Sequence, residues 1–209
     1  MKKKKYIACV GAILLCAMSL FTLSSCNNKP PDIEDVMDRF VYLIEQSKEI
    51  NSIFFGCGMP VYKNGSDISD KKNVYGNVLQ SSSPYEYFME NARYLTIDSI
   101  KLAAEQVYSE KYISSLYEAA FDGVLISDST YVRYYEDSNW IYQNKNAEAL
   151  VKNERIYLYS TMEIVKPFKS DYVNIEIDSY TVNDPENIQR IRLSFVYENN
   201  NWYLDSPTY

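Results

Sequence analysis

Near its carboxyl end the chain contains the stretch Val173-Asn174-Ile175-Glu176-Ile177-Asp178-Ser179-Tyr180, in which apolar side chains largely alternate with polar ones. A second stretch, Arg190-Ile191-Arg192-Leu193-Ser194-Phe195-Val196-Tyr197, follows the same pattern. Successive side chains of a β-strand point to opposite faces, so each stretch predicts a strand with one apolar and one polar face. Two such strands close together in the chain indicate an antiparallel sheet that packs on a core and leaves its other face in water.

Further strands are predicted on both sides of this pair. Residues 156–165 are rich in β-branched and aromatic side chains, which favour a strand. The run Glu198-Asn199-Asn200-Asn201 indicates a turn, after which residues 202–204 pair back. Shorter strands are predicted at residues 124–126, 131–135 and 140–142.

In the first half of the chain, apolar residues recur at helical spacing instead. A first helix is predicted to begin at Pro31-Asp32, because proline and acidic side chains suit the first helical turn, and to end at Gly56. A second helix begins after Thr96, and Ser109 caps a third, since both hydroxyl side chains are favoured at that position. Gly123 closes the helical section.

Residues 74–79 and 85–95 are predicted as two additional strands. The chain thus has mainly helices before Gly123 and strands after it, an order that indicates the α+β class. We expect the N-terminal helices to pack on a curved antiparallel sheet. Because no internal repeat or second linker is visible, residues 32–209 are predicted to form a single domain.

The amino-terminal segment has the features of an export signal. Lys2-Lys3-Lys4-Lys5 is followed by an uncharged stretch from Tyr6 to Asn28, whose apolar part ends near Leu23. The stretch closes with Leu23-Ser24-Ser25-Cys26, the bacterial lipoprotein motif of an aliphatic residue and two small residues before a cysteine. This pattern predicts a lipoprotein signal peptide at residues 1–25, lipidation of Cys26, and a short tether at residues 26–31.

The alternatives are a cleaved signal without a lipid and an uncleaved membrane anchor, since the apolar stretch is nearly long enough to span a bilayer. Lipidation at this motif is bacterial, and two or more acyl chains, such as palmitate, give stable anchoring. We therefore expect the protein on a bacterial cell membrane, facing the extracytoplasmic side of the cell envelope. Loss of Lys2 to Lys5 with the signal would change the net charge from -7 to -11.

Composition excludes several classes of function. The chain has no histidine, which removes Ser-His-Asp and Cys-His catalysis and most zinc and iron sites. Its acidic charge opposes binding to nucleic acids. If Cys26 is lipidated, Cys57 is the only free thiol of the mature chain, and without a histidine partner it is interpreted as a small buried residue. No metal, cofactor or catalytic residue is predicted.

The aromatic content points to binding. Five aromatic residues fall within twelve positions: Tyr131, Tyr134, Tyr135, Trp140 and Tyr142. Tyrosine and tryptophan contact partners with an apolar body and a polar tip, so a subset of these side chains is predicted to form a binding surface. Strand alternation turns half of them toward the core, and the sequence leaves open which half.

The middle and the end of the chain carry short patterns of one kind of lipoprotein. The patterns are Val107-Tyr108-Ser109-Glu110-Lys111-Tyr112, Tyr131-Val132-Arg133-Tyr134-Tyr135, Trp140-Ile141-Tyr142 and Asn201-Trp202-Tyr203-Leu204. In element order, residues 32–209 resemble lipoproteins of low-GC bacteria with a cystatin-like or NTF2-like domain, including the bacillus inhibitor of cell-wall DL-endopeptidases. This chain has a longer middle, residues 62–95, and no inhibitory motif of that family.

Two functions follow as expectations. The first is a non-catalytic binding or accessory domain, tethered to the membrane, whose partner is an envelope protein such as a cell-wall enzyme. The resemblance implies modulation of such an enzyme. The alternative is a small NTF2-like enzyme with a carboxylate or tyrosine in a cavity. Its candidate lining residues are Asp122, Asp128, Tyr131, Tyr134 and Tyr135.

The lipoprotein motif gives a direct test. Mass spectrometry of the mature protein is expected to find an amino terminus at Cys26 that carries a diacylglycerol thioether. Replacement Cys26→Ala removes the acceptor thiol and is expected to release the protein from the membrane or stall its maturation. A mature chain that starts elsewhere, or starts at an unmodified Cys26, contradicts the prediction.

Overall fold

The computed structural model describes residues 29–62, 85–88, 92–122, 124–126, 129–137, 140–144 and 153–209. The predicted signal peptide, Cys26, the predicted strand at residues 74–79 and Asp128 lie outside these residues. The α+β class is confirmed, since helices are followed by antiparallel strands.

The longest helix, α2 (Ile33–Phe55), confirms the first predicted helix. It begins after Asp32, has Glu34 and Asp35 in its first turn, and ends at Gly56. One side of it is buried over the whole length: Val36, Phe40, Leu43, Ile44, Ser47, Ile50, Asn51, Ile53 and Phe54. This apolar stripe is what the other elements cover.

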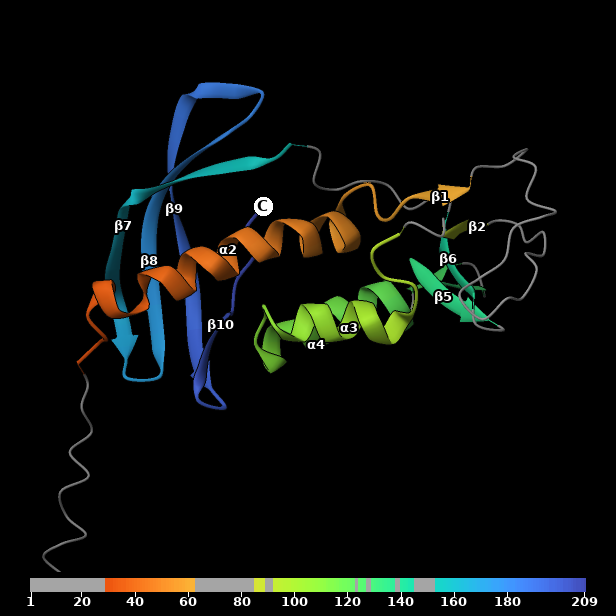
Figure 1. The fold of residues 1–209 in the computed structure, drawn as a ribbon, viewed down its shortest axis with the longest axis horizontal. Helices are drawn as coiled ribbons and strands as arrows, with labels where there is room; N and C mark the ends of the chain where they lie inside the picture. Colours follow the sequence, from red (N-terminus) through yellow and green to blue (C-terminus); the bar gives the residue numbers. More distant parts are fainter. Residues whose placement is uncertain are drawn as a thin grey trace, which may run out of the picture.

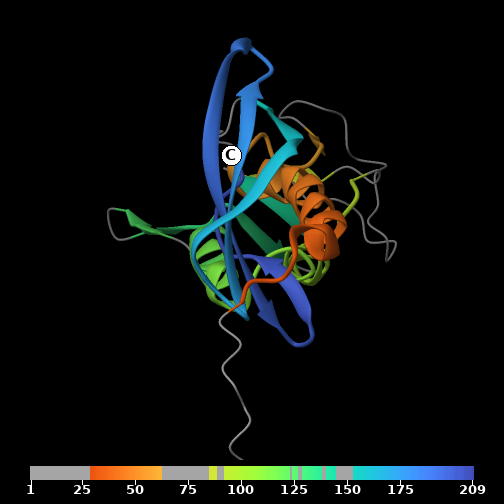
Figure 2. The ribbon, with the colours of Figure 1, turned by 90° about the vertical axis from the view of Figure 1, so that its left-hand side faces the viewer.

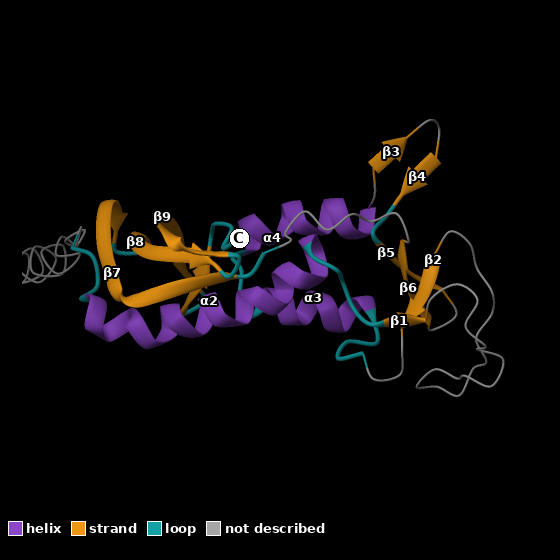
Figure 3. Ribbon diagram, turned by 90° about the horizontal axis from the view of Figure 1, so that it is seen from above, coloured by secondary structure: helices purple, strands orange, loops and turns teal. Residues whose placement is uncertain are grey.

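A four-stranded antiparallel sheet packs against the first part of α2 (Figures 1 and 3). Its strands are β7 (Arg155–Lys169), β8 (Tyr172–Thr181), β9 (Asp184–Glu198) and β10 (Asn201–Leu204), in the spatial order β10-β9-β8-β7. The turn at residues 199–200 has both asparagines at positive φ, as a tight hairpin requires. All four predicted strands of this region are confirmed, and Figure 2 shows that the sheet twists strongly.

The core forms where this sheet meets α2. The ring of Phe40 stacks on that of Phe195 at 3.8 Å between centroids and meets Trp202 edge-on at 5.5 Å. Ile175 and Ile177 of β8 are fully buried in the same cluster. The buried apolar side chains form one continuous cluster that extends to the far end of α2.

Two shorter helices lie along the second part of α2. They are α3 (Ile97–Glu105) and α4 (Glu110–Tyr117), and a π-helical turn at Glu118–Asp122 continues α4. The hydroxyl of Thr96 accepts a hydrogen bond from the Ser99 amide, and that of Ser109 accepts one from the Tyr112 amide. The predicted helix start at Thr96 and the predicted cap at Ser109 are therefore confirmed.

A second, smaller sheet covers the end of α2, far from the first (Figures 1 and 3). Its strands are β1 (Val61–Tyr62), β2 (Tyr85–Phe88), β6 (Trp140–Asn144) and β5 (Tyr134–Asp137), in that spatial order. A separate hairpin consists of β3 (Val124–Ile126) and β4 (Ser129–Tyr131).

Two sequence predictions differ from this arrangement. The strand predicted at residues 85–95 is limited to β2, and residues 92–95 are not a strand. The strand predicted at residues 131–135 is divided, because β4 ends at Tyr131 and β5 begins at Tyr134. Arg133 lies between them, and its amide donates to the Ala120 carbonyl at 3.0 Å, which turns the chain from one sheet to the other.

Arg133 also completes the carboxyl end of α2. Its guanidinium donates from Nε to the Ile53 carbonyl at 2.9 Å and from Nη2 to the Gly56 carbonyl at 2.5 Å. The last turn of α2 has no basic residue of its own. A distant arginine therefore supplies the positive charge and the donors that a helix carboxyl end favours.

Loss of these bonds is expected to destabilise the fold. In a protein of residues 27–209, Arg133→Met should lower the free energy of unfolding by about 2 kcal/mol, because hydrogen bonds to charged groups contribute about 1.5–3 kcal/mol. Urea unfolding followed by the fluorescence of the two tryptophans, Trp140 and buried Trp202, measures it. The control Arg93→Met removes an exposed ion pair with Glu49 and should cost less than about 1 kcal/mol. Equal losses for both variants would contradict the role of Arg133.

Candidate functional site

The structure divides the predicted aromatic binding cluster. Tyr134 is completely buried and Tyr142 is only 4% exposed. The Tyr134 hydroxyl donates to the Ile53 carbonyl at 2.6 Å, so its polar tip is satisfied inside the protein. The prediction that Tyr134 and Tyr142 contribute to a binding surface is therefore wrong. The two side chains point to opposite faces of the smaller sheet, because Tyr142 lies opposite Tyr135, the neighbour of Tyr134 on β5.

The other three aromatic residues of the predicted cluster are Tyr131, Tyr135 and Trp140. The half-buried ring of Tyr135 stacks on Tyr142 at 4.5 Å with an angle of 7° between the rings. Tyr131 lies at the end of β4 and Trp140 at the start of β6, but their side chains are outside the described part of the structure. The structure thus joins Tyr135 to Tyr142 and leaves the binding role of Tyr131, Tyr135 and Trp140 a prediction.

The residues proposed for an enzymatic cavity do not assemble around the pocket that the structure describes. Asp122 is exposed at the end of the π-helical turn. Burial raises the pKa of Tyr134, against the opposing effect of the neighbouring Arg133 guanidinium. A buried tyrosine that donates to a backbone carbonyl is a structural group, and it is poorly suited to proton transfer.

A pocket of about 280 Å³ lies instead at the carboxyl end of α2, where the first residues of β7 and the last residues of the chain meet the helix. It is lined by Lys48, Asn51, Ser52, Gly56, Cys57, Asn153, Glu154, Arg155, Thr208 and Tyr209. Sequence analysis did not find this pocket, because its lining comes from three segments that are far apart in the chain.

The lining residues Asn51 and Thr208 form the floor of the pocket and belong to a buried hydrogen-bond network. The Thr208 hydroxyl lies 2.6 Å from the Ser47 hydroxyl and accepts from Asn51 Nδ2 at 2.7 Å. Tyr108 donates to Asn51 Oδ1 at 2.7 Å, and Tyr157 donates to the Thr208 carbonyl at 2.5 Å. Burial is the main cause that raises the pKa of both tyrosines, so they stay neutral donors. These bonds fix the last residues of the chain on α2.

The rim of the pocket carries charge. Lys48 pairs with Glu45 at 3.0 Å and with Glu154 at 3.7 Å. Burial acts to raise the pKa of Glu45, but hydrogen bonds from Tyr159 and Lys48 outweigh it and lower that pKa. Arg155 Nη1 donates to the Ser179 hydroxyl at 2.9 Å, and no carboxylate pairs with Arg155 among the described residues.

The free thiol of Cys57 is exposed at the same rim. The expectation that Cys57 is buried is therefore wrong, because the chain turns outward after α2. The Cys57 carbonyl accepts from Gln143 Nε2 at 3.0 Å, and the Met59 amide donates to Gln143 Oε1 at 3.2 Å. Gly58, between them, has φ +80, and a Cβ there would lie 2.0 Å from Gln143 Oε1. Only glycine fits this turn without a shift of the glutamine.

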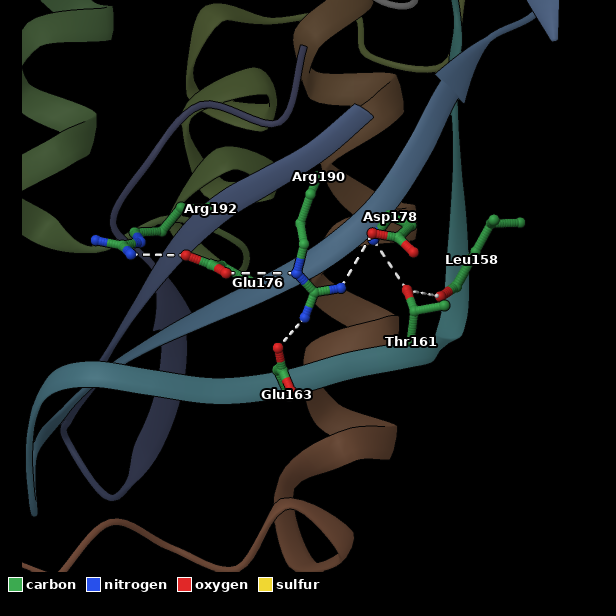
Figure 4. Close-up of polar contacts among 7 residues, drawn as sticks. All are labelled: Leu158, Thr161, Glu163, Glu176, Asp178, Arg190 and Arg192. Atoms are coloured by element: carbon green, nitrogen blue, oxygen red, sulfur yellow. Dashed lines mark hydrogen bonds and ion pairs between the residues drawn. The ribbon is translucent and has the colours of Figure 1, made fainter. Parts of the chain in front are cut away.

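A second polar feature lies on the outer face of the larger sheet, away from α2 (Figure 4). Arg190 of β9 donates to Asp178 at 3.0 Å and to Glu176 at 3.4 Å, both on β8, and it pairs with Glu163 of β7. Arg192 donates to Glu176 at 2.6 Å. We call these five residues the charged ladder. It joins three strands on a face exposed to water.

The ladder follows from the register of the strands. Glu176 lies opposite Arg192 and Asp178 lies opposite Arg190, so opposite charges meet across the strand pair. The hydrogen bond from Arg192 is the main cause that lowers the pKa of Glu176. Hydrogen bonding to Asp178 is the main cause that raises the pKa of Arg190. The alternation in the sequence predicted the polar face, but only the register brings its charges together.

Comparison of the sequence with models of protein families and with curated proteins finds no match. Within the described ranges, no group of three or more cysteine, aspartate or glutamate residues is placed to hold a metal ion. No helix in that part of the chain is long and apolar enough to cross a membrane.

The charged ladder makes a prediction about proton binding. In a protein of residues 27–209, the substitution Arg192→Gln should raise the pKa of Glu176. A pH titration of the ¹³C chemical shift of the Glu176 carboxyl carbon measures this pKa. A carboxyl whose pKa is lowered by folding stabilises the fold above its ordinary pKa and loses this effect as the pH falls through the lowered value. The stabilisation by Glu176 should therefore disappear at higher pH in the variant.

Arg155→Gln is the matched control, because Arg155 lies outside the charged ladder and contacts Ser179 rather than Glu176. It should leave the titration of Glu176 unchanged. A Glu176 titration that is the same in Arg192→Gln as in the unaltered protein would show that Arg192 does not hold this carboxylate in solution.

Proposed function

We propose that this chain is a lipid-anchored protein of the bacterial cell envelope. In this proposal, its folded part binds another envelope protein and carries out no reaction. The observation that carries the proposal is the Leu23-Ser24-Ser25-Cys26 motif directly after a basic and then apolar amino terminus. The motif supports a location on the extracytoplasmic side of the membrane, where cell-wall enzymes are candidate partners.

The tether supports a role close to the membrane. Residues 26–31 are six residues that include the pair Pro30-Pro31, so they span at most about 20 Å. The helix α2 begins two residues later, at Ile33, and its 23 residues extend about 35 Å. A short tether confines the folded part to the membrane surface, where a modest affinity for another membrane-bound protein is enough.

Charge supports a protein partner over an anionic wall polymer. The mature chain would have a net charge of -11, which repels polyanions and favours basic patches on proteins. The charged ladder exposes three carboxylates, from Glu163, Glu176 and Asp178, around two arginines. Such a fixed polar face is suited to orienting a partner, because its side chains are held before the partner arrives.

The chemistry of the described residues gives catalysis little support. A general acid needs a raised carboxyl pKa, whereas the pKa values of Glu45 and Glu176 are lowered. The chain has no histidine to activate the Cys57 thiol. The pocket favours one alternative, a domain that acts on a small molecule, because Arg155 lines it and is bonded to the neutral side chains of Ser179 and Gln189 rather than to a described carboxylate.

The test compares full-length lipidated protein with two variants, after cross-linking in the cell of origin and purification from its membranes. The unaltered protein should capture a defined envelope protein. Cys26→Ala should lose that protein, because the variant is no longer concentrated at the membrane surface. Arg155→Gln alters the rim of the pocket and the bonds of Arg155 to Ser179 and Gln189, and it should capture that protein as well as the unaltered protein does.

The variant Arg155→Gln distinguishes binding of an envelope protein from action on a small molecule. If Arg155→Gln folds normally and keeps its position on the membrane but abolishes the function of the protein in the cell, the pocket acts on a small molecule. The binding proposal is then wrong. If Cys26→Ala captures the envelope protein as well as the unaltered protein does, the lipid anchor is not needed for binding.

A further inference from the structure

The hairpin between β8 and β9 projects beyond the rest of the fold (Figures 1 and 2). Every residue from 182 to 190 is exposed. Two of them are large and apolar, Val182 at 51% exposure and Ile188 at 56%. Exposed apolar side chains on a projecting strand mark a surface that another chain can reach.

Among the described residues, no strand pairs with the outer edge of β9 along this hairpin. β10 pairs only with residues 195–198 of β9, and the Asp205 amide donates to the Ser194 carbonyl just beyond them. From residue 193 back to residue 184, no described backbone group pairs with β9 on the side away from β8. Such an edge exposes amide and carbonyl groups that can pair with another strand.

The sequence of this edge is complementary to itself. It reads Asp184-Pro185-Glu186-Asn187-Ile188-Gln189-Arg190-Ile191-Arg192, with acids on one side of Ile188 and arginines at equal distances on the other. If two copies run antiparallel and cross at Ile188, Glu186 of each lies opposite Arg190 of the other. Asp184 then lies opposite Arg192, and the two Ile188 side chains meet. A parallel alignment would place like charges together.

We propose that two copies of this chain form a symmetric dimer through the edges of their β9 strands, centred on Ile188. Along an edge strand, the amide and carbonyl groups of every second residue point outward, away from the neighbouring strand. The Ser194 carbonyl points outward to Asp205, which gives this role to the even-numbered residues in the regular part of β9. The same alternation continues through Ile188 in the dimer. Pro185, which has no amide hydrogen, then falls at a position where none is needed.

The charged ladder extends across this interface. Within one copy, Arg190 and Arg192 of β9 lie beside the carboxylates of β8. In the dimer they gain Glu186 and Asp184 of the second copy on their other side, so a row of arginines lies between two rows of acids. Charges on an edge strand normally oppose pairing, but here their order favours pairing with an identical strand.

The two-fold axis of such a pair is perpendicular to the sheet, so the charged ladders of both copies face the same side. The four strands of each copy then form one sheet of eight strands, and one face of this sheet carries both charged ladders. This dimer is independent of the proposed envelope function.

The test is a cross-link at the symmetry axis in the full-length protein, purified in detergent. Directly opposed residues of such a pair have Cα atoms about 5.5 Å apart, within the usual range of a disulfide. With Cys57→Ser in the background, Ile188→Cys should form a covalent dimer under mild oxidation. Peptide mass spectrometry should identify a fragment containing position 188 joined to its own copy.

Two further variants make the outcome specific. Leu102 lies on α3 and is 59% exposed, so Leu102→Cys places a thiol on the surface away from the proposed interface. This variant should stay monomeric. Asp184→Lys with Glu186→Lys puts like charges at four contacts and should weaken dimerisation at least about tenfold in sedimentation measurements. The proposal is overturned if the unaltered protein stays monomeric at high concentration. It is also overturned if Leu102→Cys cross-links equally well, or if the charge reversal has no effect.

Discussion

The structure depends on burying the apolar stripe of α2 along its whole length. A helix of 23 residues is too long for one small sheet to cover, so two groups of elements share it. The twisted sheet β7–β10 packs on the first part through Phe195 and Trp202. Helices α3 and α4 and the smaller sheet pack on the second part. Because both groups fill one continuous core, a change at either end of α2 is felt by the packing of the other.

Much of this arrangement could be predicted because local patterns encode it. Alternation over residues 173–180 and 190–197 identified two strands of the larger sheet, and Thr96 and Ser109 identified the starts of two helices. What the patterns could not give is which side of a short strand faces inward. Tyr134 and Tyr135 are adjacent and chemically identical, yet only Tyr134 is buried, because the carbonyl of Ile53, 81 residues earlier, accepts its hydroxyl. Such a choice is made by tertiary contact, which a single sequence does not display.

The same limit applies to the polar sites. The outward direction of Glu176 and Asp178 follows from alternation, but their contact with Arg190 requires the register between β8 and β9. A prediction of the pocket would have required the positions of three separate segments, because α2, the start of β7 and the last residues of the chain all line it. Cys57 had a plausible interpretation as a buried residue, and it failed because Gln143 holds the following turn in an outward course. Residues that act through distant partners are thus the ones that sequence analysis misses.

The two polar sites also differ in what they can offer a ligand. In the floor of the pocket, Ser47, Asn51 and Thr208 already satisfy one another, so a ligand would have to compete with bonds that hold the chain together. At the rim, Arg155 is likewise bonded, to Ser179 and Gln189. On the outer sheet the charges are also paired, but they remain exposed, and no described strand pairs with the edge of β9 beside them. A surface that can accept another strand without breaking an internal bond is the less costly place for recognition, which is why binding at the sheet fits this fold better than binding in the pocket.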